Sequence, residues 1–138
     1  MPITNGKITL DTKGFTDIID ITKEVENIVY SHKIENGQVL VYTSGSTASI
    51  TSMEYEPGLI KDFPDILDKL IPMDYKYQHD EKWHDGNGYA HIRASIIGNS
   101  FNIPIINGSL SLGTWQQIVL VDFDNKPRTR QVIVQIIY

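Results

Sequence analysis

The sequence predicts an α+β fold, with helices packed on a mixed or antiparallel β-sheet core, in one compact domain over residues 1–138. Apolar runs of strand type occupy the first dozen residues and most of the chain after residue 100. Segments whose apolar residues recur at helical spacing lie between them. Because the two patterns do not alternate strictly, we expect about three helices and about seven or eight strands in an α+β arrangement.

The N-terminal part of the chain predicts two strands, a helix and a third strand. Apolar and polar residues alternate over residues 4–12, and residues 15–19 are suited to pair back as a second strand. From Thr22 the apolar residues recur at helical spacing until the Asn36-Gly37 dipeptide ends the helix. Residues 38–42, QVLVY, then predict a short strand.

A cluster of small hydroxylated residues, TSGSTASIT, covers residues 43–51. Such a stretch can bring several backbone N–H groups together as an anion-binding nest. It can equally be a plain turn between two strands. It is not a Walker A motif, because no Gly-Lys-Ser/Thr follows. Beyond it, Glu54 and Glu56 share one side if the second strand continues.

Two further helices are predicted in the middle of the chain. Residues 58–70 are apolar on one face, and Pro64 within them indicates a kink or two shorter helices. Residues 89–97 form the other helix, which Gly98 ends. The inward faces are expected to consist of Leu59, Ile60, Phe63, Ile66, Leu67 and Leu70 in the first helix, and of Ile92, Ile96 and Ile97 in the second.

The remainder of the chain predicts β-structure. Residues 101–106 form a strand, and Asn107-Gly108 is a strong hairpin signal that leads into residues 109–112. Residues 114–123 form one long strand, and residues 129–138 form a matching return strand after a turn. The apolar runs in both long strands indicate burial on both faces.

Composition excludes several kinds of site. The chain has no cysteine, so it has no disulfide, iron–sulfur cluster or thiolate zinc site. A net charge of -5 argues against a nucleic-acid partner. No apolar run has the length of a signal peptide or a membrane span. We therefore expect a cytoplasmic enzyme or binding protein without a membrane partner.

Three of the four histidines lie in the stretch from Tyr77 to Ser95, which also carries several acids and the flexible Gly-Asn-Gly run. His79 and His84 are predicted in a loop, and His91 on the following helix. Histidine and carboxylate side chains together indicate a divalent metal site with nitrogen and oxygen ligands. Loop histidines can also be merely solvated, and no His-Glu-x-x-His motif is present.

Other chemistry has less support. The serines of residues 43–51 lie in no Gly-x-Ser-x-Gly elbow, so nucleophilic catalysis is unsupported. The cations Lys61, Arg93, Arg128 and Arg130 are candidates for binding a phosphate or carboxylate. Because Arg128 and Arg130 follow a hairpin turn, we interpret them as surface charge.

Four sequence blocks together resemble the YjbQ-like family. They are residues 46–59 (STASITSMEYEPGL), 85–100 (DGNGYAHIRASIIGNS), 103–110 (IPIINGSL) and 112–124 (LGTWQQIVLVDFD). Some members of this family are described as secondary thiamine-phosphate synthases. The resemblance implies a compact α+β fold, a homotrimer and a histidine-lined pocket for a divalent metal, Mg²⁺ or Zn²⁺. It implies no organic cofactor.

By position, His79 matches the family histidine that follows a tyrosine-rich segment, and His91 matches the second histidine of a His-x-His pair. Tyr89 stands in place of the first histidine of that pair, and its ordinary pKa near 10 makes it a poor base. Gly45 stands where many members carry a histidine. The resemblance thus implies an incomplete histidine site, with His79 and His91 as metal ligands and His84 as a substitute.

The implied reaction joins a pyrimidine-methyl diphosphate to a thiazole phosphate and releases pyrophosphate. Its leaving group needs neutralisation, commonly by Mg²⁺ and a cation. The implied catalytic residues are His79, His91 and Glu54. The implied phosphate-binding groups are Gly45, Ser46, Thr47 and Arg93.

Two alternatives remain at this point. One is a non-catalytic trimer that binds a small phosphorylated metabolite or a metal. The other is a metal-assisted hydrolase that acts on a small phosphate ester.

Overall fold

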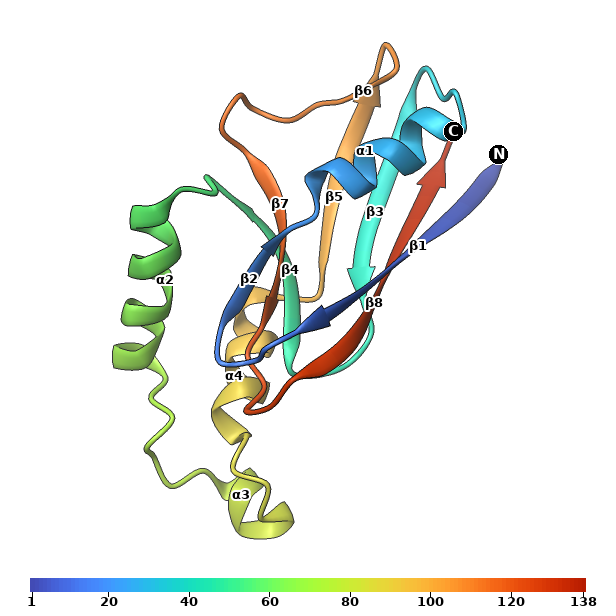
Figure 1. Ribbon diagram of the computed structural model, residues 1–138. Coiled ribbons are helices and arrows are strands. Elements are labelled where there is room, and N and C mark those ends of the chain that lie inside the picture. The colour runs from blue at the N-terminus through green and yellow to red at the C-terminus, as the bar shows by residue number, and fades with distance from the viewer.

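Two antiparallel sheets form the framework of the structure, a computed structural model that describes residues 1–138 (Figure 1). The larger sheet has the strand order β1-β8-β3-β5-β6 and the smaller sheet has the order β2-β7-β4. The strands are β1 (Ile3–Thr12), β2 (Asp17–Asp20), β3 (Gly37–Thr43), β4 (Ala48–Met53), β5 (Ser100–Ile106), β6 (Ser109–Leu110), β7 (Gln117–Asp122) and β8 (Arg128–Ile137). The helices are α1 (Thr22–Ser31), α2 (Pro57–Leu70), α3 (Gln78–Trp83) and α4 (Gly88–Ile97). The predicted α+β class is confirmed.

The two long C-terminal strands do not pair with each other, although the sequence predicts a hairpin. β7 pairs with β2 and β4, whereas β8 pairs with β1 and β3 in the other sheet. The second N-terminal strand, β2, likewise pairs with β7 and not with β1. β7 is also shorter than predicted and starts at Gln117. The pairings differ from the predicted hairpins because the turns after β1 and β7 carry the chain from one sheet to the other (Figure 1).

Both faces of β7 are buried, as its continuous apolar run predicts. Ile118 and Leu120 contribute to the core shared by the two sheets and α1, while Val119 and Val121 face α2 and α4. β8 differs, because its burial alternates and only one face is fully covered. β7 is therefore the central strand of the fold, and its end at Asp122 lies deep in the protein.

The inward face of α4 is not the predicted one. Tyr89, Arg93 and Ala94 are buried, whereas Ile92 is 40% exposed and Ile96 is 66% exposed. Ile97 is partly buried against the second core. The buried polar groups of Arg93 find acceptors inside the protein, and the small Ala94 allows close approach to β4, where Ser49 Oγ donates to Ala94 O at 3.3 Å. These contacts, and not burial of the isoleucines, determine which face of α4 points into the protein.

α2 is a single helix that continues through Pro64, so the predicted division into two shorter helices is wrong. Of its apolar residues only Leu67 is fully buried, and Ile66 and Leu70 are exposed. The helix begins after Glu56, whose side chain accepts hydrogen bonds from the backbone N–H groups of Gly58 and Leu59. Glu56 is thus a helix cap.

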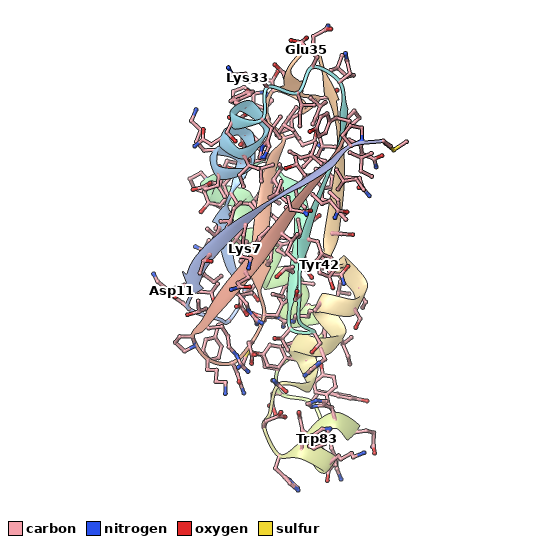
Figure 2. All side chains as sticks on the ribbon, turned by 90° about the vertical axis from the view of Figure 1, so that its right-hand side faces the viewer. Lys7, Asp11, Lys33, Glu35, Tyr42 and Trp83 are labelled. Carbon is pink, nitrogen blue, oxygen red and sulfur yellow. The ribbon has the colours of Figure 1, made fainter.

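The segment between α2 and α4 contains a fourth helix, α3, where the sequence predicts a loop. Figure 2 shows α3 and Trp83 at the end of the molecule opposite Lys33 and Glu35, below the sheets. The end of β7 and the starts of β4 and β8 lie toward the same end (Figure 1). None of the helices is long and apolar enough to cross a membrane.

Candidate functional site

A cavity of about 350 Å³ lies where the β3–β4 loop, α3, the start of α4 and the start of β8 meet. It brings together five of the predicted site residues, His79, His91, Gly45, Ser46 and Thr47. It also contains Arg128 and Arg130, which the sequence interpretation assigns to the surface, and four residues to which it gives no role. The remaining lining residues are Trp83, Asp85, Asn87, Asp124, Arg128 and Arg130.

The two histidines form a stacked pair in this cavity. The ring centroids of His79 and His91 are 4.2 Å apart, and the ring planes are inclined by 37°. His79 reaches the pair from α3 and not from a loop, and His91 comes from the first turns of α4. Burial, together with the neighbouring His79, lowers the pKa of His91 below its ordinary 6.5. His91 is therefore a neutral imidazole at pH 7.

The lowered pKa of His91 predicts a specific pH dependence. The unfolded chain binds the proton more tightly than the folded protein, so the neutral imidazole contributes stability that is fully present above pH 6.5. That stability is lost as the pH falls from 6.5 through the lowered pKa. NMR titration of the imidazole should give a midpoint below 6.5 for His91, and the midpoint should rise in a His79→Gln variant. A midpoint at or above 6.5 in the wild type would contradict this.

His79 is also the centre of a group suited to a cation. Its Nδ1 atom lies 3.3 Å from Asp80 Oδ1 and 3.4 Å from Asp85 Oδ1. One ligand atom from each of the three residues lies within 4.8 Å of the others. One imidazole nitrogen and two carboxylate oxygens form a donor set that fits Zn²⁺ or Mg²⁺. This set differs from the predicted one, because His91 stacks on His79.

His84 takes no part in either group. It follows α3 in a left-handed backbone conformation with φ 59°, its side chain is exposed, and it does not line the cavity. Asp85, the next residue, does line the cavity. Asn87 lies between two carboxylates: its nitrogen is 3.3 Å from Asp124 Oδ1, and with the amide turned over it donates to Asp85 Oδ1 at 3.0 Å.

The floor of the cavity is a buried network of two aspartates and two arginines. Arg130 donates from Nε to Asp122 Oδ2 at 2.7 Å and from Nη2 to Asp122 Oδ1 at 3.0 Å. Arg128 donates from Nε to Asp124 Oδ2 at 2.9 Å. Both aspartates are fully buried, and the Arg130 side chain is only 11% exposed. The interpretation of Arg130 as surface charge is therefore wrong, whereas Arg128 is exposed and joins the network from the surface.

Thr47 connects this network to the β3–β4 loop. Its Oγ1 atom donates to Asp124 Oδ2 at 3.0 Å and accepts from Arg130 Nη2 at 2.8 Å. Burial alone would raise the pKa of Asp124, but hydrogen bonds from Asn125 N–H, Asn87, Thr47 and Arg128 outweigh it and hold the pKa below its ordinary value. Asp124 is thus an ionised anchor and not a general base.

The spacing of these four charged residues along the sequence is a signal for the network. Asp122 and Asp124 are two residues apart at the end of one strand, and Arg128 and Arg130 are two residues apart at the start of the next. In extended chain, residues two apart point the same way. Opposite charges in this spacing on both sides of a short turn favour ion pairs across it.

Gly45 has a backbone conformation that favours glycine, with φ +113°. A Cβ atom at this position would lie 3.3 Å from Nη1 of Arg130. Nε and Nη2 of that guanidinium are engaged with Asp122 and Thr47. The third nitrogen of Arg130 therefore stands beside the open space over Gly45, where it can donate to an anion.

Two predicted site residues lie elsewhere. Arg93 is 1% exposed, and its guanidinium donates to Ile71 O, Thr16 Oγ1 and Asp68 Oδ1. It therefore joins α4 to the end of α2 and to the β1–β2 turn, away from the cavity. Glu54 is exposed, just beyond the end of β4, and does not line the cavity.

Tyr89 is fully buried, and its hydroxyl has no hydrogen-bond partner in the protein. Burial raises its pKa to about 12. The Arg93 guanidinium lies 5.0 Å from the centre of the Tyr89 ring. A phenol with this pKa does not accept or lose a proton at neutral pH, so Tyr89 does not replace a histidine base.

The sequence and the structure both match one family over almost the whole chain. Residues 6–138 match the family described as UPF0047 protein YjbQ-like. A UPF0047 protein of Archaeoglobus fulgidus is 43% identical over 129 residues, which cover 94% of this chain and 98% of the relative. The Bacillus subtilis UPF0047 protein YugU is 35% identical over 129 residues, covering 93% and 95% of the two chains.

Solved structures show the same fold. A YbjQ-like protein of unknown function from Sulfolobus solfataricus has a TM-score of 0.93 at 32% identity and covers 98% of this chain and 96% of its own. A YjbQ/UPF0047 family protein from Clostridium acetobutylicum has a TM-score of 0.87 at 39% identity, with 96% and 99% coverage. On this evidence the chain belongs to the YjbQ-like (UPF0047) family.

Proposed function

We propose that this protein is an enzyme acting on small phosphorylated metabolites, with the reaction of a secondary thiamine-phosphate synthase. A pyrimidine-methyl diphosphate and a thiazole phosphate are joined, and pyrophosphate leaves. The observation that carries the proposal is the composition of one cavity: His79 and His91 share it with the Gly45–Thr47 loop and the Arg130 guanidinium. Proton-bearing groups and anion-binding donors are the two kinds of group that such a reaction needs.

The anion is bound on the side of the β3–β4 loop. Backbone N–H groups of Gly45 to Thr47 and the free nitrogen of Arg130 supply the donors, and Arg128 lines the same side. The loop is held in place because Thr47 bonds to Asp124 and Arg130. Such preorganised donors lower the free energy of a leaving anion without reorganisation.

The floor carries no net positive charge, since two aspartates face two arginines. A diphosphate therefore needs a further positive charge. The donor set of His79, Asp80 and Asp85 fits a divalent metal, which when bound would neutralise the departing diphosphate. Without it, His79 still positions the reacting group, because the two carboxylates fix the orientation of its ring.

His91 supplies a hydrogen-bond donor to the leaving group in this proposal. Its lowered pKa keeps it neutral at pH 7, so it has one nitrogen that donates and one that accepts. A neutral imidazole can hydrogen-bond the leaving oxygen through its N–H. Ser95 Oγ donates to the backbone carbonyl of His91 at 2.8 Å and leaves the ring free. Glu54 has no place in this scheme, because it lies outside the cavity.

We also propose that the chain assembles as a homotrimer. Two helices expose apolar side chains that a partner subunit would cover, Ile92 and Ile96 on α4 and Ile66 and Leu70 on α2. Sedimentation or light scattering of the purified protein measures this directly.

The reaction is tested with purified protein, both substrates and either Mg²⁺ or a chelator. We expect thiamine phosphate and pyrophosphate in equal amounts with the metal, and a clear drop with the chelator. Inactive heat-denatured protein is the blank. Absence of product with both Mg²⁺ and Zn²⁺ would contradict the proposal.

One observation favours a second candidate, a metal-assisted hydrolase of small phosphate esters. The His79, Asp80 and Asp85 set resembles a site that activates water as well as one that binds a diphosphate. Release of inorganic phosphate from simple esters, without a second substrate, would favour it. A rise in melting temperature with a phosphorylated ligand, without turnover or bound metal, would favour a binding protein instead.

A further inference from the structure

A second cavity of about 310 Å³ adjoins the first, between the β3–β4 loop, β4 and the end of α4. Gly45 and Ser46 line both cavities. We propose that the second cavity holds the heterocyclic part of a phosphate ester whose phosphate occupies the first. This rests on the proposed function and assigns the substrate a shape: an anionic head joined to a small uncharged ring.

The chemistry of the walls separates the two cavities. No charged side chain lines the second cavity, whereas arginines, acids and histidines line the first. Its walls are the methyl groups of Ala48 and Ala94 with the polar side chains of Ser46, Ser95 and Asn99. Uncharged walls that combine methyl groups with hydroxyl and amide groups can contact both the face and the heteroatoms of a small ring. An uncharged heterocycle with ring nitrogen or sulfur atoms fits this lining.

Gly45 is the junction between the two cavities. Its missing side chain leaves open the space beside Nη1 of Arg130, and any Cβ there would lie 3.3 Å from that nitrogen. A ligand can therefore contact Arg130 with its phosphate and continue past Gly45 into the uncharged cavity. Because the phosphate and the ring then occupy different cavities, the ligand carries a linker between them, as a phosphorylated side chain on a heterocycle provides.

Ser95 offers a direct test, because its side chain is exposed on α4 and bonds only to its own helix. A Ser95→Phe variant fills the second cavity and leaves the first untouched. Isothermal titration with thiazole phosphate should show binding weakened by about tenfold or more, while inorganic pyrophosphate should bind within about twofold of the wild type. Ser31→Phe is the matched control: Ser31 is exposed at the end of α1, its Oγ also donates to a carbonyl of its own helix, and it lines neither cavity, so both affinities should stay unchanged.

The outcomes distinguish this inference from the proposed function. Equal weakening of both probes by Ser95→Phe, or no weakening of either, overturns the inference while the wild-type affinities stand. Failure of the wild type to bind pyrophosphate and thiazole phosphate overturns the proposed function and the inference with it. Circular dichroism checks folding, and Asn99→Tyr fills the cavity from the opposite wall if Ser95→Phe does not fold.

Discussion

Replacing Asp122 by Asn is expected to destabilise the protein by about 3–5 kcal/mol, the cost of breaking a buried ion pair by removing one charge. Asp122 is fully buried at the end of β7 and accepts four hydrogen bonds, from Arg130 twice, from Thr12 and from the backbone of Asp124. An asparagine at this position presents one acceptor and one donor group. The Arg130 charge then remains in a buried site with less compensation.

Urea unfolding followed by circular dichroism measures this loss. Asp62→Asn is the control, since Asp62 is exposed on α2 and its replacement should change the stability by no more than about 0.5 kcal/mol. The double variant Asp122→Asn/Arg130→Met should be less destabilised than the sum of its single variants, because it leaves no unpaired charge. A loss below about 1 kcal/mol in Asp122→Asn would show that Arg130 finds another partner.

The elements of the fold follow from local patterns, whereas their pairing does not. Alternation predicts β1, and the hairpin dipeptide Asn107-Gly108 predicts the connection from β5 to β6. The partner of β7 depends on the chain changing sheets at the turns on either side of it. Nothing in the apolar run of β7 distinguishes a hairpin with β8 from a place between β2 and β4. Sheet membership is a property of the whole core.

The inward face of α4 is a second feature that local sequence patterns do not predict. Isoleucines at Ile92 and Ile96 outrank Arg93 on any hydropathy scale, so the helical pattern places the arginine outside. In the structure Arg93 is buried because Ile71 O, Thr16 and Asp68 provide acceptors from three separate segments. Those partners lie up to 77 residues away along the chain. The hydropathy of arginine therefore does not predict that Arg93 is buried.

The candidate site also has one part that the sequence predicts and one part that it does not. Clustering in sequence identifies His79 and His91, and the structure brings them into contact. The floor of the site, with Asp122 and Arg130, is assembled from a strand end, a strand start and the β3–β4 loop. Its residues are ordinary charges in sequence and become a site only through burial. The location of the site and its Gly45–Thr47 loop are therefore predictable from sequence, and the buried charges beneath them are not.

The histidine pair gives the largest expected change in activity. His91→Ala should lower turnover by about 10²- to 10³-fold, the loss that removal of a positioned hydrogen-bond donor to developing negative charge causes, with little change in affinity for pyrophosphate. His79→Ala should lower turnover as strongly and also abolish metal binding, because His79 supplies the only nitrogen of the proposed donor set. Steady-state kinetics measures the first effect, and elemental analysis after dialysis measures the second.

His84→Asn is the matched control for both variants. His84 is exposed, lines no part of the cavity, and has a left-handed backbone conformation that asparagine tolerates. It should retain wild-type turnover and metal content. If His84→Asn loses as much activity as His91→Ala, the chemistry does not reside in the stacked pair. If His79→Ala keeps its metal while turnover falls, the cation belongs to other ligands, and the stacked pair contributes only hydrogen bonds to the leaving group.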